Sequence, residues 1–352
     1  MYKRVLNSIT IFRKRGPGTL VNSLLTKGSL FFKPNYCLNQ PNFAQIEITT
    51  YCNLKCSTCR EFEDQFGEGG MMSKHMTLEK FREILSKLPY LTNLRLNGIG
   101  EPLLNPQLFK MINYASTKGI RTNFVTNGTM LKKDATAELI NSGLNLLIFS
   151  IDGAGKETFE RVRAGAKFDE VCQNIRNIVG IKKQRGRVKP HLAVMTTVSK
   201  ENIRELPEIV SLVNSLGIKN IILKGMIPSV RELEAKIVSD DEIYRFISRA
   251  QETADNLQMN LHSSPFKRIS GKKTSPENTG CMWPWTSTYI NVDGWVTPCC
   301  NLFDSSMINF GNIFEKDFKI IWNNKDIQKF RSRLKIDEAR ICYKMCDLYL
   351  YR

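Results

Sequence analysis

The feature that most restricts the fold is an alternation of short apolar runs with amphipathic segments from residue 43 to about residue 225. The apolar runs are rich in β-branched residues and occupy 45–50, 91–98, 120–128, 144–153, 191–198 and 218–225. The segments between them repeat apolar residues at helical spacing, notably in 76–88, 105–119, 130–143 and 202–217. Gly119 and Gly143 end two of these segments, as expected just beyond a helix.

Strands that alternate with helices form a parallel sheet. Six such units suit a barrel better than a small doubly wound sheet, although their spacing alone leaves both folds open. We therefore predict an α/β fold built on a partial (β/α)6 TIM-like barrel. After residue 225 we expect the alternation to stop, with one more helix near 239–258 and a polar linker at 270–280.

Polar and glycine-containing motifs follow the first four expected strands. They are TTYCNLKC after the first, NGIGEP after the second, TNG after the third and SIDG after the fourth. In both candidate folds the carboxyl ends of parallel strands carry the chemistry. The sequence therefore predicts that these four motifs meet at one site.

The composition indicates a globular protein in a reducing compartment, and we expect it to be cytoplasmic. No apolar run is long enough to span a membrane, and no secretory signal is evident. Eight of the ten cysteines fall in three tight clusters, a pattern that favours metal binding over disulfides in a protein that is not secreted.

The formal net charge of +17 favours an anionic partner. Residues 1–46 carry seven Lys and Arg residues and no acid, and 182–189 carries five more basic residues. The alternative is that these residues only confer solubility. Basic residues flank 5–12, where apolar residues at helical spacing suit either peripheral contact with an anionic bilayer or packing under a barrel. No nucleic acid partner is expected, because the chain lacks the aromatic and basic strand pattern of RNA-binding folds.

Cys52, Cys56 and Cys59 place three thiols within eight residues. A structural zinc site is closed by four ligands, and a cubane iron–sulfur cluster has four irons to ligate. Three thiolates would leave one iron open to bind a ligand and support chemistry. A zinc-binding or fortuitous set remains the alternative.

The C-x3-C-x2-C spacing directly after a first strand resembles the signature of the radical S-adenosylmethionine (radical SAM) enzymes. The resemblance implies a [4Fe–4S] cluster on Cys52, Cys56 and Cys59 whose open iron chelates S-adenosylmethionine. A low-potential donor of the flavodoxin or ferredoxin type would reduce the cluster. Cleavage of the cofactor would then give a 5′-deoxyadenosyl radical that abstracts hydrogen from a substrate. Thr58 stands where the family usually has an aromatic residue near the adenine.

The same resemblance assigns cofactor contacts to six further residues, namely Gly100, Glu101, Asn127, Ser150, Asp152 and Arg163. Gly100 and Glu101 would meet the methionyl amino group, and Arg163 its carboxylate. The ends of the third and fourth strands would approach the ribose and the sulfonium. Ordinary turn chemistry is the alternative for Asn-Gly and Asp-Gly. Cys172 lies on an apolar helix face and is expected to be a buried thiol rather than a ligand.

The cysteine-bearing tail resembles the SPASM domain, or its shorter twitch form, which binds auxiliary iron–sulfur clusters. VDGWVTP would form its hairpin with Asp-Gly as the turn. The full pattern has seven cysteines and two clusters, whereas this tail has five. We expect one auxiliary [4Fe–4S] cluster, held by Cys281, Cys299, Cys342 and Cys346. Cys300 could replace Cys299, and zinc on the same thiols is the alternative.

These observations divide the chain into four parts: a basic extension at 1–42, the barrel at 43–235, a connecting helix and linker at 236–275, and the auxiliary-cluster domain at 276–352. We expect a small anionic substrate, either sugar-like, nucleotide-linked or lipid-linked, that is oxidised, epimerised or coupled. A peptide-modifying enzyme is the first alternative, although few residues precede the first strand to form a leader-recognition domain. A non-enzymatic metal-binding scaffold with an anionic partner is the second.

Overall fold

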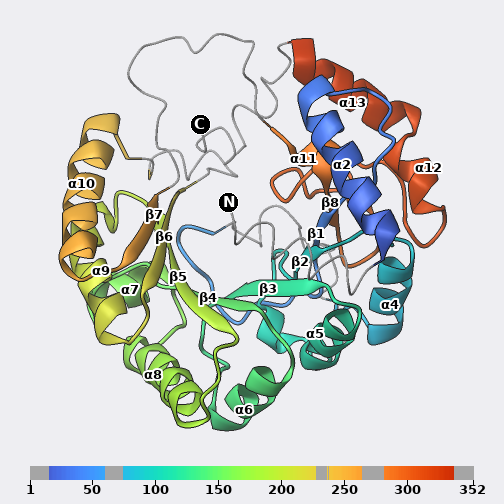
Figure 1. The fold of residues 1–352 in the computed structure, drawn as a ribbon. Helices are drawn as coiled ribbons and strands as arrows, with labels where there is room; N and C mark the ends of the chain where they lie inside the picture. Colours follow the sequence, from blue (N-terminus) through green and yellow to red (C-terminus); the bar gives the residue numbers. More distant parts are fainter. Residues whose placement is uncertain (1–15, 60–73, 227–235, 237, 264–280, 337–352) are drawn as a thin grey trace.

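The computed structural model describes residues 16–59, 74–226, 236, 238–263 and 281–336 (Figure 1). Its strands form one sheet in the order β7-β6-β5-β4-β3-β2-β1-β8-β9. The strands are β1 Phe43–Ile46, β2 Asn93–Arg95, β3 Arg121–Thr126, β4 Leu146–Ser150, β5 His191–Val198, β6 Asn220–Gly225, β7 Asn260–Ser263, β8 Ser287–Ile290 and β9 Val296–Thr297. All neighbouring pairs are parallel except β8 and β9.

Helices separate most of the strands along the chain. They are α2 Pro17–Phe32, α4 Leu78–Ser86, α5 Leu108–Thr117, α6 Lys133–Asn141, α7 Lys156–Val162, α8 Phe168–Gln184, α9 Leu206–Ser215, α10 Asp240–Asn256, α11 Trp283–Thr286, α12 Phe318–Trp322 and α13 Lys325–Ile336, with 3-10 turns at Pro102–Leu104 and Ile203–Glu205. Helix α2 precedes β1, and α12 and α13 follow β9. Figure 1 shows the strands β1 to β7 following an arc, with α4, α5, α6, α8, α9 and α10 on its outer side. The six predicted strands and the partial TIM-like barrel are confirmed.

The helix α4 illustrates how the sequence builds the outer layer. Its N-cap Thr77 accepts a hydrogen bond from the backbone N of Lys80. Phe81 and Ile84 are fully buried against the sheet. Gly119 and Gly143 have positive φ angles of 72° and 90°, so they end their helices in the left-handed region that glycine tolerates.

The expectation that the alternation stops at residue 225 was wrong. Helix α10 falls within the expected helix at 239–258, but β7 follows it and pairs with β6 in parallel. This strand was missed because Asn260, His262 and Ser263 are exposed and form no apolar run. The polar segment 270–280 lies outside the described residues.

The tail continues the same sheet at its other end. Strand β8 pairs in parallel with β1, and the antiparallel β9 follows it. Asn291 accepts from Gly294 N, and Gly294 has a φ of 90°, so the predicted Asp-Gly hairpin turn is confirmed. The first strand of the barrel therefore lies beside the first strand of the tail.

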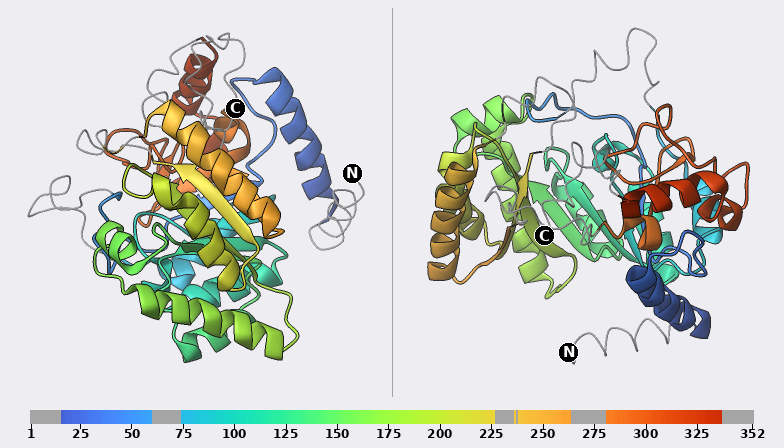
Figure 2. Two further views of the ribbon diagram at one scale, coloured as in Figure 1. Left: turned by 90° about the vertical axis from the view of Figure 1, so that its left-hand side faces the viewer. Right: turned by 90° about the horizontal axis from the view of Figure 1, so that it is seen from above.

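Helix α2 packs beside α11 at the edge of the molecule, as the two views in Figure 2 show. The loop after it is tied to the tail, because Asn39 donates its side-chain N–H to Trp285 O at 2.8 Å and accepts the indole N–H of Trp322 at 2.7 Å. None of the helices in the described part of the chain combines the length and apolar content needed to cross a bilayer. The segment 5–12 lies outside the described residues.

Candidate active site

The loop that follows β1 carries the three predicted cluster cysteines. Cys52 and Cys59 are exposed and Cys56 is half-buried. The loop backbone is fixed to the end of α7 and the residues just after it, since Ser57 N donates to Val162 O at 2.8 Å and Lys55 N donates to Ala164 O at 3.0 Å. Among the described residues, no three Cys, His, Asp or Glu side chains converge on a point where one metal ion could bind. A cubane cluster does not require such convergence, because each thiolate ligates a different iron.

A partly buried ion pair holds the same loop from a second direction. Lys236 Nζ lies 2.8 Å from Glu201 Oε1 and donates to Ser57 O at 2.8 Å. Ser57 Oγ in turn donates to Glu201 Oε1 at 3.2 Å. Sequence reasoning missed both charged residues, because they lie far from the cysteines in the chain and carry no motif.

The end of β3 holds the loop from a third direction. Asn127 donates its side-chain N–H to Asn53 Oδ1 at 2.9 Å, and Asn53 donates to Thr129 Oγ1 at 2.9 Å. Asn127 Oδ1 also accepts from Thr129 N at 3.0 Å. The predicted site residue Asn127 therefore has a structural task, which is to join the cysteine loop to the third strand.

Gly100 and Glu101 pack directly on the backbone that leads into the cysteine loop. A Cβ on Gly100 would lie 2.5 Å from the carbonyl oxygens of Thr49 and Tyr51, and Glu101 N donates to Tyr51 O at 2.8 Å. The Glu101 carboxylate is buried and accepts from Thr126 Oγ1 at 2.7 Å and from Asn127 N at 2.8 Å. Burial raises the pKa of Glu101, and these donors lower it in part.

Asp152 and Arg163 form a buried ion pair beside the cysteines. Arg163 Nη2 lies 2.6 Å from Asp152 Oδ2, and Asp152 Oδ1 accepts from Thr197 N at 2.7 Å. Burial lowers the pKa of Arg163, but Asp152 and Cys56 raise it, and the net shift is upward. Arg163 Nε is buried and has no hydrogen-bond partner among the described residues. Burial raises the pKa of the Cys56 thiol to about 11, although the charge of Arg163 lowers it.

The predicted motifs therefore meet at the carboxyl ends of β1 to β4. Ser150, the last residue of β4, is buried two positions before Asp152. Cys172 is buried on α8 beside Val171, which confirms that it is a core thiol. The barrel motifs thus form a single assembly around the cysteine loop.

Comparison with known proteins settles the family. The model of the radical SAM superfamily matches residues 46–213, and that of the iron–sulfur cluster-binding SPASM domain matches 281–347. The chain is a radical SAM enzyme with a SPASM domain. It follows that its cofactors are a [4Fe–4S] cluster, S-adenosylmethionine and auxiliary iron–sulfur binding in the SPASM domain.

Relatives of this radical SAM enzyme carry different functions. The chain is 27% identical over 310 residues to the tungsten-containing aldehyde ferredoxin oxidoreductase cofactor-modifying protein of Pyrococcus furiosus, covering 82% of this chain and 83% of that protein. It is 27% identical over 328 residues to the AdoMet-dependent heme synthase of Methanosarcina barkeri, covering 88% and 89%. The crystal structure of Streptococcus suis SuiB bound to precursor peptide SuiA superposes with a TM-score of 0.68 at 17% identity, covering 89% and 71%.

Two of the predicted auxiliary-cluster cysteines lie in the described part of the SPASM domain. Cys281 lies just before α11, and the buried Cys299 lies just after β9. Cys342 and Cys346 lie outside the described residues. The hairpin of the domain is tied to the radical SAM barrel by an ion pair, since Lys74 Nζ lies 2.9 Å from Asp293 Oδ1.

Glu47 provides a second and more buried tie between the barrel and the SPASM hairpin. Its carboxylate accepts from Ile99 N at 3.0 Å, Val292 N at 3.2 Å and Tyr289 Oη at 3.3 Å. Burial raises the pKa of Glu47, and the three donors lower it in part. Sequence reasoning missed Glu47, because a single acid inside a strand-like run carries no motif.

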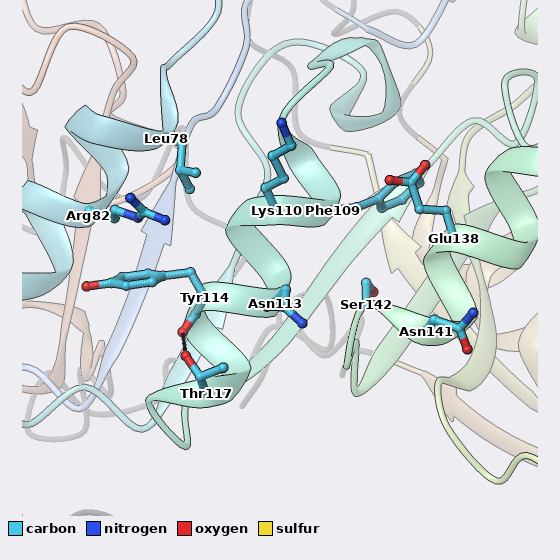
Figure 3. Close-up of a pocket in the computed structure, with 10 residues that line it drawn as sticks. All are labelled: Leu78, Arg82, Phe109, Lys110, Asn113, Tyr114, Thr117, Glu138, Asn141 and Ser142. Carbon is cyan, nitrogen blue, oxygen red and sulfur yellow. Dashed lines mark hydrogen bonds between the residues drawn. The ribbon is translucent and has the colours of Figure 1, made fainter.

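A surface groove of about 550 Å³ lies on the outer helical layer of the radical SAM barrel (Figure 3). It is bordered by α4, α5 and the end of α6, with Arg82, Lys110 and Glu138 among its lining residues. These helices cover the outside of the sheet, whereas the cysteine loop follows the carboxyl end of β1. The groove is therefore not part of the candidate active site.

Proposed function

We propose that the enzyme cleaves S-adenosylmethionine reductively and abstracts a hydrogen atom from a small anionic substrate bound on the inner face of the barrel. The bound cluster would supply one electron to the sulfonium of S-adenosylmethionine, and the chemistry obtained would be release of methionine and transfer of a substrate hydrogen atom to the 5′-deoxyadenosyl group. Cys52, Cys56 and Cys59 are the proposed ligands of that cluster. Three thiols on a loop that is fixed from three directions suit this task.

The remaining predicted residues are proposed to hold the cofactor directly or through a neighbour. Arg163, near Cys56, has a buried Nε donor with no partner in the described part of the chain, so a carboxylate of the cofactor would satisfy it. Asp152 would orient Arg163 through their ion pair. Gly100, Glu101, Asn127 and Ser150 remain proposed contacts of the amino group and ribose, and the first three also position the cysteine loop.

The observation that carries the substrate class is the charge on the inner face of the barrel. Along β2 and β3, Leu94 and Phe124 face the helical core, so the alternating residues Arg95 and Asn123 face the interior. Arg95 Nε donates to Asn123 Oδ1 at 3.0 Å, as two side chains on one face would. Arg121 lies on this face as well, two residues before Asn123.

Neither interior arginine is neutralised by the described part of the chain. No carboxylate among the described residues forms an ion pair with Arg95 or Arg121. Arg121 Nε is buried and has no hydrogen-bond partner in the described segments. Guanidinium groups bind phosphate and carboxylate in a bidentate manner, and an unpaired buried donor is costly. An anionic substrate group would satisfy both requirements.

The positions of these arginines favour an extended substrate. Arg95 is in register with Asn123, and Asn123 with Leu146, which lies four residues before Ser150 at the end of β4. Four residues of strand span about 13 Å. The anionic group would therefore bind about this far along the strands from the reacting carbon at the carboxyl end of the sheet. A nucleotide-linked or lipid-linked sugar has this length and charge. Oxidation, epimerisation and coupling all remain compatible with such a substrate.

We also propose that Cys281, Cys299, Cys342 and Cys346 hold one auxiliary [4Fe–4S] cluster. A cluster with four thiolates has no open iron, so the chemistry it supplies is electron transfer. We propose that a low-potential electron donor of the flavodoxin or ferredoxin type reduces the clusters. We also propose a cytoplasmic location, because a reducing compartment keeps the cysteine thiols available as cluster ligands.

The substrate proposal is tested with inorganic pyrophosphate as the probe. We expect the reconstituted enzyme to bind pyrophosphate, and Arg95→Gln and Arg121→Gln to weaken that binding about tenfold or more, as the loss of a charge-assisted pair implies. Arg187→Gln is the matched control, because Arg187 is exposed in the basic run 182–189. It should leave the binding unchanged.

A second assay separates the substrate classes. Formation of 5′-deoxyadenosine is measured with fractions of phosphorylated metabolites and, separately, with peptide fractions. Stimulation by the phosphorylated fraction, reduced in both interior variants, is the expected result. Stimulation by peptides alone, or equal pyrophosphate binding in all three variants, would replace the small anionic substrate with the peptide alternative.

A further inference from the structure

Helix α2 has its polarity reversed relative to an ordinary surface helix. The buried side chains of the helix are all polar: Thr19, Asn22, Thr26 and Ser29. The opposite face presents large apolar side chains to the solvent: Leu20, Val21, Leu24, Leu25, Phe31 and Phe32. Phe31 is 81% exposed and Leu24 is 58% exposed. A soluble helix normally buries its apolar stripe, so this face needs an apolar environment of its own.

Specific hydrogen bonds fix this orientation of α2. Asn22 donates its side-chain N–H to Gln40 O at 3.0 Å and accepts from Gln40 N at 2.8 Å. Ser29 Oγ donates to Asn39 Oδ1 at 2.5 Å. Asn39 is itself bonded to Trp285 and Trp322 of the SPASM domain. Rotation of α2 to bury its leucines would leave these buried polar groups unpaired, so the apolar face is held outward.

The charge around this face identifies its partner. Residues 1–46 contain seven basic residues and no acid, and Arg13, Lys14 and Arg15 directly precede the helix. Lys27 is exposed, and at 100° per residue it lies at the border of the apolar face. Figure 2 shows α2 at the periphery of the molecule in both views. An apolar face with Lys27 at its border, in a segment of the sequence that has seven basic residues and no acid, matches an anionic lipid surface.

We propose that α2 docks the enzyme on an anionic lipid bilayer, with the side chains of Leu24, Phe31 and their apolar neighbours in the interfacial region. The helix lies parallel to the surface, because its polar face remains bonded to the protein. Lys27, at the border of the apolar face, contacts the anionic headgroups. This inference rests on α2 alone and is independent of the substrate proposal.

The test is co-sedimentation of the full-length, reconstituted enzyme with vesicles. Vesicles of mixed phosphatidylglycerol and phosphatidylcholine should bind the enzyme, and pure phosphatidylcholine vesicles should bind it at least about tenfold more weakly. Added salt should weaken the binding to the mixed vesicles. Leu24→Glu and Phe31→Glu should each reduce that binding by about tenfold or more, since each places an acid in the apolar interface.

The matched control is Tyr244→Glu. Tyr244 is 49% exposed on α10, which lies at the other end of the sheet from α2 (Figure 1). This variant should bind vesicles as the parent does, and all three variants should retain the unfolding midpoint and 5′-deoxyadenosine formation in solution.

Three results would overturn the inference. The first is absence of binding to the mixed vesicles, and the second is an equal loss of binding in the Tyr244→Glu control. The third is self-association in light scattering that Leu24→Glu abolishes without affecting vesicle binding, which would assign the face to a second copy of the chain.

Discussion

Replacement of Gly100 by Ala should displace the cysteine loop. A Cβ at this position would lie 2.5 Å from the carbonyl oxygens of Thr49 and Tyr51, whereas ordinary Cβ contacts begin at 3.4 Å. Both neighbours are backbone atoms, so the loop and the turn after β2 must separate by about 0.9 Å, the difference between these two distances. Overpacking of this kind costs about 1–3 kcal/mol, and weakening of the bond from Glu101 N to Tyr51 O adds about 1 kcal/mol. We expect a total loss of about 2–4 kcal/mol in the free energy of unfolding.

The assay is urea unfolding of the metal-free protein under anaerobic conditions, followed by iron analysis after reconstitution. Gly100→Ala should unfold at lower urea and incorporate less iron at the radical SAM site. Gly180→Ala is the matched control, because Gly180 lies inside α8 and a Cβ there meets nothing within 4 Å. It should stabilise the protein by about 0.5–1 kcal/mol and leave the iron content unchanged. An unchanged free energy and iron content in Gly100→Ala would refute the close packing at this position.

Three further predictions concern buried charges. Asp152→Asn should lower the free energy of unfolding by about 3–5 kcal/mol, because it leaves Arg163 buried without an ion partner; a loss below about 1 kcal/mol would contradict the pair. Glu47 has a pKa raised by burial, so its contribution to stability is full below its unfolded value of 4.5 and is lost as pH rises through the higher folded value. Urea unfolding at several pH values should show this loss relative to Glu47→Gln, and parallel curves would argue against it. Arg331 is fully buried and donates to Pro284 O and Asn35 O, so Arg331→Met, which leaves these two carbonyl oxygens without their donor, should destabilise the protein by about 1–3 kcal/mol and speed chymotrypsin cleavage after Tyr36. Cleavage at the parental rate would show that Arg331 does not hold this loop.

The periodic part of the fold could be predicted from the sequence, because its signals are local. Buried strands and helices require apolar residues at fixed spacing, and Gly119 and Gly143 mark two helix ends. The hairpin turn at Asp293 and Gly294 was equally local. Strand β7 gave no such signal, because it is an exposed edge strand with polar residues.

The site could be predicted only where its residues form motifs. The cysteine spacing and the motif at Gly100 were readable, but the contacts that fix them were not. Glu201 and Lys236 reach Ser57 through tertiary structure, from more than 140 positions along the chain. The reversed polarity of α2 also escaped sequence analysis, since apolar periodicity does not reveal which face of a helix is buried.

The most direct measurement is the iron and sulfide content of the anaerobically reconstituted protein, with EPR spectra recorded with and without S-adenosylmethionine. An open cluster on the cysteine loop and a closed one in the SPASM domain predict about eight irons per chain, with one signal that shifts when the cofactor is added. Cys56→Ala should lose that responsive signal and keep the other. Zinc in place of iron, or EPR spectra that do not change when S-adenosylmethionine is added, would contradict an enzyme with an open catalytic cluster.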